Sequence, residues 1–292
     1  HPRAPPPDEA LDLIAREGGT QVNGFEAHLK ALCDAQEARP RNLRTLRTGL
    51  MALGQASAVA TIDVLSGGRL LPAFGVGSPR AAEWKVTGRE AKGAGAMAEE
   101  GMQIISRLWK EENVTFHGGH FHLEGATISP RPVQKELPLW VGGSSEAALR
   151  RTARIGTGWQ AGGETPQELG PIVARIKALT AECGRSIDAD HYGAGIAFRF
   201  GNWEEDIVAR QAAAYQKRTA RDPRLAFAVG DARVLVERIR GYIDAGICKF
   251  ILRPMGRDDA DFLDQSKRVI AEVMPEVAAM NAAAKAAAAA KA

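Results

Sequence analysis

Short apolar runs alternate with longer mixed segments along most of the chain, starting at residue 44. The apolar runs predict strands at 46–53, 70–76, 137–141, 156–162, 192–200 and 249–252. The mixed segments predict helices at 57–65, 99–110, 146–154, 171–183, 204–219, 231–245 and 261–280. Strands that alternate with helices through short links indicate a parallel α/β fold.

Residues 114–123 interrupt this order with two short runs around Gly118-Gly119, which predicts a β-hairpin. The hairpin carries His117, His120 and His122, and the last two would share one face of a strand, a workable spacing for metal ligands. Glu124 is the only carboxylate close in sequence. We therefore favour a solvated hairpin and expect no metal site.

The two ends of the chain depart from the pattern. Segments 9–15 and 26–36 could be helices, but residues 1–43 hold no apolar run suited to a central strand. Either strand-forming segments are missing there or this end is remodelled. Residues 282–292 are only Ala and Lys, a strong helix former with nothing to pack. We expect one domain over 1–292, atypical over 1–43 and extended by the tail.

Composition narrows the class of protein. With 292 residues, 45% of them apolar, the chain suits one large core and is close to the roughly 250 residues of a (β/α)₈ barrel, although two domains also fit. No run approaches the roughly 20 apolar residues of a membrane span, and no signal-peptide pattern opens the chain. The net charge of +3 is scattered, which argues against nucleic acid. Three distant cysteines favour a reducing cytoplasm.

The segment Gly142-Gly143-Ser144-Ser145 is the strongest candidate site. It follows a predicted buried strand and precedes a helix, where backbone N–H groups and the helix dipole favour an anion such as phosphate. Glycine lets a phosphate approach the backbone, and Ser144 or Ser145 can cap the helix or bind an oxygen. The alternative is an ordinary turn with a serine N-cap.

Other candidates lie at predicted strand ends. Gly75-Val76-Gly77 is not a dinucleotide fingerprint, because the third glycine is absent and Pro79 follows. In a barrel it would lie at the carboxyl end of a strand, where active sites lie. Trp159 would line a ring pocket or pack in the core. Arg253 would need an anionic partner, from a ligand or from a neighbouring Asp or Glu. Segment 66–69 and His191 precede strands and are expected to be structural.

An ordered set of short motifs lies within residues 61–159, and the family resemblance that they carry extends over roughly 44–255. The motifs are TIDVLSGGR at 61–69, FGVG at 74–77, EW at 83–84, GR at 88–89, LW at 108–109, VTF at 114–116, PRPVQ at 130–134, PLWVGG at 138–143, ALRR at 148–151 and GTGW at 156–159. Each is weak alone, but their order resembles the luciferase-like monooxygenase family of flavin- or F420-dependent oxidoreductases, the bacterial luciferase superfamily.

The chain departs from this family in three places. The aromatic and histidine-bearing segment expected near strand two is absent. After Leu53-Gly54-Gln55 the family usually has a longer link before its helix, but here Ala56-Ser57 follows directly. Lys92-Gly93-Ala94-Gly95 stands where an Arg-Gly pair is usual. Cofactor contacts from these places are therefore in doubt.

The resemblance implies a (β/α)₈ TIM barrel with an insertion after strand four, near 78–135, and a cofactor at the carboxyl ends of the strands. Glu83 would act as an acid or base, or pair with Arg80 or Arg89, and Arg253 is the other catalytic candidate. The expected cofactor-binding residues are Gly75, Gly77, Met51, Gly142, Gly143, Ser144, Ser145, Gly158 and Trp159.

Two chemistries fit the resemblance, both on a small organic substrate. Reduced FMN can activate dioxygen, with a separate flavin reductase as partner, whereas F420 transfers a hydride. The stretches 156–159 and 192–201 favour F420 slightly. A homodimer is expected from the family. The rivals are a non-catalytic flavin-binding degenerate barrel and another phosphate-binding barrel enzyme such as an isomerase.

Overall fold

The structure is a computed structural model that describes residues 6–17, 21–23, 32, 35–36, 38–41, 48–50, 56–77 and 92–289, with only the backbone for 21–23, 48–50 and 283–289. The chain divides into two compact units, His1–Trp159 with Leu179–Ile187, and Gln160–Ala178 with Asp188–Ala292. The single domain over 1–292 stays a prediction. Met51 and Glu83 lie outside the described residues, as does most of the predicted helix 26–36.

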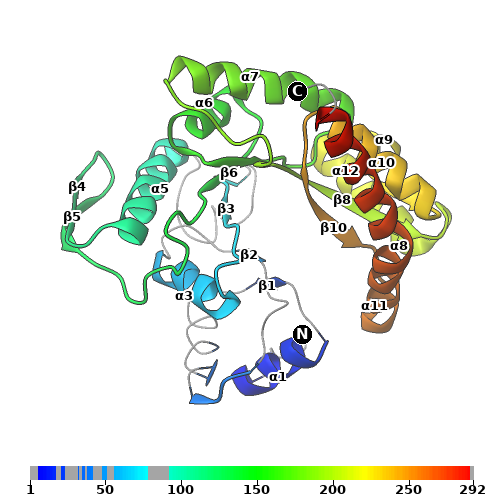
Figure 1. Ribbon diagram of the computed structural model, residues 1–292, viewed down its shortest axis with the longest axis horizontal. Coiled ribbons are helices and arrows are strands. Elements are labelled where there is room, and N and C mark those ends of the chain that lie inside the picture. Colours follow the sequence, from blue (N-terminus) through cyan, green and yellow to red (C-terminus); the bar gives the residue numbers. More distant parts are fainter. Residues whose placement is uncertain are drawn as a thin grey trace. The chain divides into compact units, whose positions relative to one another are not determined.

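The first unit contains parallel strands that are followed by helices (Figure 1). Its elements are α1 (Pro7–Glu17), β1 (Gln21–Asn23), β2 (Thr48–Leu50), α3 (Ala56–Ser66), β3 (Ala73–Phe74), α5 (Ala94–Lys110), β4 (Val114–His117), β5 (His122–Ala126), β6 (Trp140–Gly142), α6 (Glu146–Ile155) and β7 (Gly158–Gln160). The pairs β1–β2 and β3–β6 are parallel, and β6 lies between β3 and β7. The antiparallel pair β4–β5 confirms the predicted hairpin.

One core joins α3, α5, β3 and β6. The indole of Trp109 lies 6.1 Å from the ring of Phe74, and its Nε1 donates to the carbonyl of Ala56 at 3.0 Å. Burying apolar side chains of this size is the main term that stabilises such a unit. Other members of this core are Val59, Ile62, Leu70, Met102, Ile105, Leu139 and Val141.

The turn after α3 serves stability, as its position before a strand predicts. Gly67 and Gly68 have φ values of 66° and 77°, a left-handed conformation that ends the helix. The buried Asp63 accepts from the backbone N–H of Gln134 at 3.0 Å and from its side chain at 2.6 Å. These bonds tie α3 to the segment that leads into β6.

The second unit is organised around the long strand β8 (Tyr192–Phe200). This strand pairs in parallel with β10 and with β9. The remaining elements are α7 (Pro166–Glu182, which ends in the first unit), α8 (Asp206–Thr219), α9 (Pro223–Ala226), β9 (Ala228–Gly230), α10 (Ala232–Asp244), β10 (Lys249–Pro254), α11 (Asp259–Arg268), the π-helix η1 (Val269–Val273) and α12 (Met274–Ala289). Within the described residues, no helix is both long and apolar enough to cross a membrane.

The structure corrects several predicted boundaries and adds one strand. The helix predicted from Pro171 begins at Pro166, because Thr165 and Glu168 form a capping box: Glu168 Oε2 accepts from the Thr165 backbone N–H at 2.7 Å. Strand β9 was missed, although the apolar run 225–229 leads into it. The strand predicted at 137–141 begins at Trp140, and the helix predicted at 261–280 is three consecutive helical segments.

Candidate functional site

The turn between β6 and α6 has the geometry expected of a helix N-terminal anion site. Gly143 has φ +108°, a conformation that favours glycine, and a Cβ there would lie 3.2 Å from the Ala148 Cβ, which is a tight contact. Ser145 is the N-cap of α6, and its Oγ accepts from the Ala148 N–H at 3.3 Å. The positive end of the α6 dipole therefore lies at Gly142–Ser145.

A second glycine segment lies at the same edge of the sheet. Because β3 and β6 are parallel, Gly75-Val76-Gly77 and the turn at Gly143 leave their strands in the same direction. Among the described residues, a Cβ on Gly75 or on Gly77 would meet nothing within 4 Å, and Gly77 has φ +79°. No described side chain therefore covers the backbone of these two glycines. Donor groups for a phosphate and an open cradle for a ring fit a flavin or deazaflavin.

Gly158 and Trp159, also predicted to bind the cofactor, are covered by protein. The place of a Gly158 Cβ is taken by the indole of Trp140. Trp159 has no exposed surface, and its Nε1 donates to the Gly143 carbonyl at 2.9 Å. Their direct contact with a cofactor stays a prediction, but the structure gives both residues a packing role.

Two arginines fix helix α6 to α5, the exposed Arg154 and the buried Arg151. Arg154 makes two hydrogen bonds of 2.7 and 2.8 Å to Glu99, and Arg151 donates to the Gly95 carbonyl at 3.0 Å. Burial lowers the pKa of Arg151, whose guanidinium would lie 2.9 Å from a Cβ at Gly95. The departure from the family at 92–95 thus makes room for an arginine from α6.

In the second unit, Arg253 lies near the carboxyl end of β10. Within the described part of the chain no carboxylate pairs with it, and its guanidinium lies against the backbone of Gly195, 3.2 Å from where a Cβ would be. Surrounding protein lowers the pKa of Arg253, and the positive charge of Arg218 lowers it further. Its side chain is nevertheless exposed, so an anion in solution can reach it.

Arg199, also in the second unit, is the opposite case, and the sequence reasoning missed it. It is buried at 4% exposure and pairs with Glu205 and Asp261, each at 2.7 Å, and with the Met255 carbonyl at 3.0 Å. Although burial alone would raise the pKa of Asp261, hydrogen bonds from Arg257 and Arg199 hold that pKa well below its usual range. An arginine within the apolar run 192–200 was the signal available.

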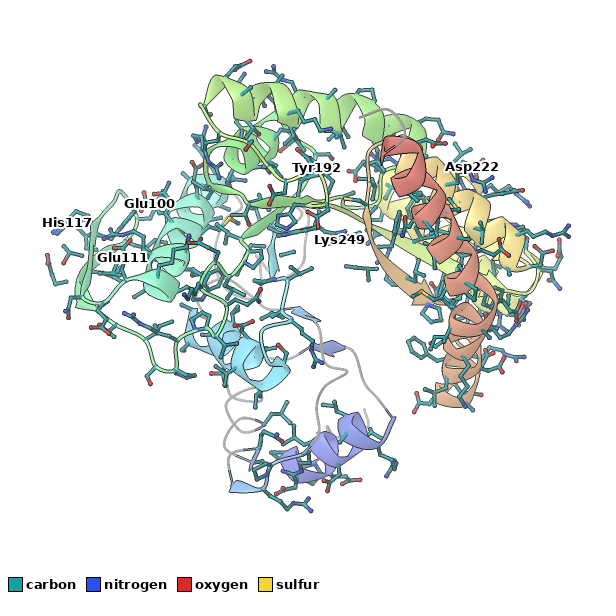
Figure 2. All side chains as sticks on the ribbon, viewed as in Figure 1. Glu100, Glu111, His117, Tyr192, Asp222 and Lys249 are labelled. Carbon is teal, nitrogen blue, oxygen red and sulfur yellow. The ribbon has the colours of Figure 1, made fainter. Side chains whose placement is uncertain are left out.

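The hairpin histidines contact protein groups. His117 Nε2 lies 3.0 Å from Glu124 Oε1. Glu100 on α5 lies beside the hairpin that carries His117 (Figure 2), and it accepts from the backbone N–H groups of Gly119, His120 and Phe121 at 2.8–3.1 Å.

Within the described ranges, the groups near enough to share an ion are instead Asp188, Asp190 and His191. These residues precede β8, and Lys249 Nζ pairs with Asp190 at 2.8 Å. In the second unit Lys249 and Tyr192 lie where β10 and β8 begin (Figure 2).

Solved structures of similar shape define the fold class. A monooxygenase, RslO1, from Streptomyces bottropensis has a TM-score of 0.70 at 16% identity and covers 93% of both chains. An F420-dependent secondary alcohol dehydrogenase has 0.68 at 18% identity, covering 91% of this chain and 95% of that one. The oxygenating constituent of 3,6-diketocamphane monooxygenase from Pseudomonas putida, solved with FMN, has 0.66 at 13%, covering 92% of both. The chain therefore has the fold of the luciferase-like (β/α)₈ barrels.

A family model described as luciferase-like monooxygenase matches residues 54–238. The protein belongs to this family, as its ordered motifs predicted. The matched range includes the β4–β5 insertion and the turn at Gly142–Ser145.

Two relatives found by sequence are about one third identical to this chain or less. An uncharacterized protein of Mycobacterium tuberculosis is 33% identical over 132 residues, which is 45% of this chain and 44% of that protein. The chain thus matches less than half of the length of this relative. An F420-dependent glucose-6-phosphate dehydrogenase of Intrasporangium calvum is 29% identical over 257 residues, with 75% of this chain and 73% of that protein covered.

Proposed function

We propose that this protein is an oxidoreductase that uses F420 or FMN on a small organic substrate. The observation that carries the proposal is the shared edge of β3 and β6, where an open glycine segment and the amino end of α6 leave the sheet together. Membership of the luciferase-like family and the F420-dependent relatives support it.

In this proposal the chain binds and orients the cofactor. The backbone N–H groups and hydroxyls of Gly142–Ser145 bind the phosphate, and the bare backbone at Gly75 and Gly77 accommodates the ring. When bound, F420 would supply hydride transfer, whereas reduced FMN would supply the activation of dioxygen. A homodimer in the cytoplasm and, with FMN, a reductase partner belong to the same proposal.

Arg253 has a separate role in this proposal. A guanidinium that has no carboxylate partner among the described residues, crowded by protein and repelled by Arg218, is stabilised when an anion binds. We assign Arg253 to an anionic group of a substrate. Replacing it with Met should raise the KM for such a substrate and leave the fold intact.

The first test is a binding titration of the purified protein with FMN and F420, each oxidised and reduced. Tight binding of F420 assigns hydride transfer, and tight binding of reduced FMN assigns oxygen chemistry. Binding of neither overturns the proposal. Tight binding without turnover of any candidate substrate favours the non-catalytic flavin-binding rival, which the atypical segment 1–43 motivates.

The second test places a charge in the turn. Gly143→Asp combined with Ser144→Ala should weaken binding of the preferred cofactor at least about 100-fold, because a carboxylate would face the phosphate. Gly143→Asn with Ser144→Ala is the matched control, since Asn and Asp tolerate positive φ similarly and Asn is neutral. Equal affinities for the two variants would remove the phosphate from this turn.

A further inference from the structure

We infer that Trp159 is a positioning residue for the phosphate site, which orients the Gly142–Ser145 turn without touching the cofactor. This inference rests on the proposed function. It starts from the hydrogen bond between Trp159 Nε1 and the Gly143 carbonyl, 2.9 Å long and formed by a side chain with no exposed surface.

The bond determines which way the next amide points. The carbonyl of Gly143 and the N–H of Ser144 belong to one planar trans peptide unit, so they point in opposite directions. Because Trp159 holds the carbonyl toward the buried indole, the Ser144 N–H points away from the core. That is the direction from which an anion would approach the amino end of α6.

The turn needs such a restraint because of its backbone. Gly143 has φ +108°, and glycine crosses between conformations more readily than any other residue. A rotated peptide at this point would present a carbonyl oxygen, which repels a phosphate. A neutral hydrogen bond of this kind is typically worth about a factor of ten in an equilibrium.

The indole of Trp159 is itself held in place by its surroundings. Just before it, Gly158 has no side chain, and the indole of Trp140 from β6 fills the place that a Cβ of residue 158 would take. Trp159 follows directly and is enclosed completely. An enclosed side chain in the core has one rotamer available, so its N–H has a fixed direction.

The test compares ligands that differ only by phosphate. For Trp159→Phe, which keeps an apolar ring and removes the N–H, we expect the Kd for FMN to rise about tenfold and that for riboflavin to stay unchanged. F420 and its deazaflavin nucleoside, which lacks the phosphate and the groups beyond it, form a second and less strict pair. Trp109→Phe is the matched control, because this buried tryptophan also donates one bond, to Ala56 at 3.0 Å, away from the turn.

The outcomes separate two failures. If the wild-type protein binds FMN no more tightly than riboflavin, and F420 no more tightly than its nucleoside, the phosphate site itself is wrong. If the wild type prefers the phosphorylated ligand but Trp159→Phe changes both affinities equally, or neither, the positioning role is wrong.

A measurement on the wild type covers the case in which the variant does not fold. With the five tryptophans labelled with ¹⁵N, the Trp159 indole N–H signal should shift when FMN or F420 binds and not with the phosphate-free partner. If FMN or F420 binds and the chemical shift of the Trp159 indole N–H does not change with either, the inference is overturned.

Discussion

Single residues in this chain are most constrained where glycine allows close approach. At Gly158 a methyl group would overlap the indole of Trp140, and at Gly241 in α10 it would make only an ordinary contact with Pro166, at 3.7 Å. Gly158→Ala should therefore lower the free energy of unfolding by about 1–3 kcal/mol. Gly241→Ala should raise it by up to about 1 kcal/mol, since alanine favours a helix. Urea unfolding of both variants checks this, and similar effects would contradict it.

Tyr242 predicts an alkaline dependence of stability. Burial raises its pKa to about 12, whereas an unfolded tyrosine titrates near about 10. Between these values the unfolded chain has lost the proton and the folded chain has kept it, so stability is complete below pH 10 and falls as the pH rises toward 12. The loss should approach about 2–3 kcal/mol.

Comparison with Tyr242→Phe isolates this effect, because Tyr192 and Tyr215 also have raised pKa values. The variant loses the hydrogen bond from the Tyr242 hydroxyl to the Glu164 carbonyl, so its free energy of unfolding should be lower at neutral pH. As the pH rises from about 10 to about 12, that free energy should fall less in the variant than in the wild type. Parallel curves for the two proteins would refute the assignment.

Residue patterns predicted some of these features and could not predict others. The glycine and serine identities placed the turn at Gly142–Ser145 correctly, because strand, glycine and N-cap are local signals. The bond from Trp159 to Gly143 could not be found this way, since the two residues are 16 positions apart and meet through packing.

Among the helices and strands, the buried network at Arg199 joins β8 to α11 and to the segment between β10 and α11. Arg199→Met should cost about 3 kcal/mol, because Glu205 and Asp261 would both lose the buried guanidinium, although Arg257 would still pair with Asp261. The matched control is Arg233→Met, whose pair with Asp231 is exposed. Urea unfolding should separate the two, and a small effect at Arg199 would show that water replaces the guanidinium.

Element types followed from the alternation of apolar and mixed segments, but boundaries did not. The capping box at Thr165-Pro-Gln-Glu168 is visible in the sequence and was overlooked because Pro171 was read as a start. Strand β9 was also overlooked, because its apolar run 225–229 lies directly between two helices that the polar pattern marks more strongly.

For the whole molecule, the order of motifs carried the fold class, which composition alone left open between one domain and two. A whole-chain prediction follows from the proposed site. On saturation with FMN or F420, hydrogen exchange should slow in peptides covering 74–77 and 142–148, and stay unchanged in the hairpin 114–126. Protection in the hairpin alone would place the ligand elsewhere.

The contact between Glu100 and the β4–β5 hairpin has a consequence for how this region can evolve. The Glu100 carboxylate binds the hairpin tip through the backbone N–H groups of residues 119–121. The hydrogen bonds that fix the tip therefore do not depend on which side chains it carries. Gly118 is the exception, because a Cβ would collide with Glu100. The side chains of His120 and Phe121 can therefore change in evolution, for example to a new recognition sequence, without loss of the loop's shape.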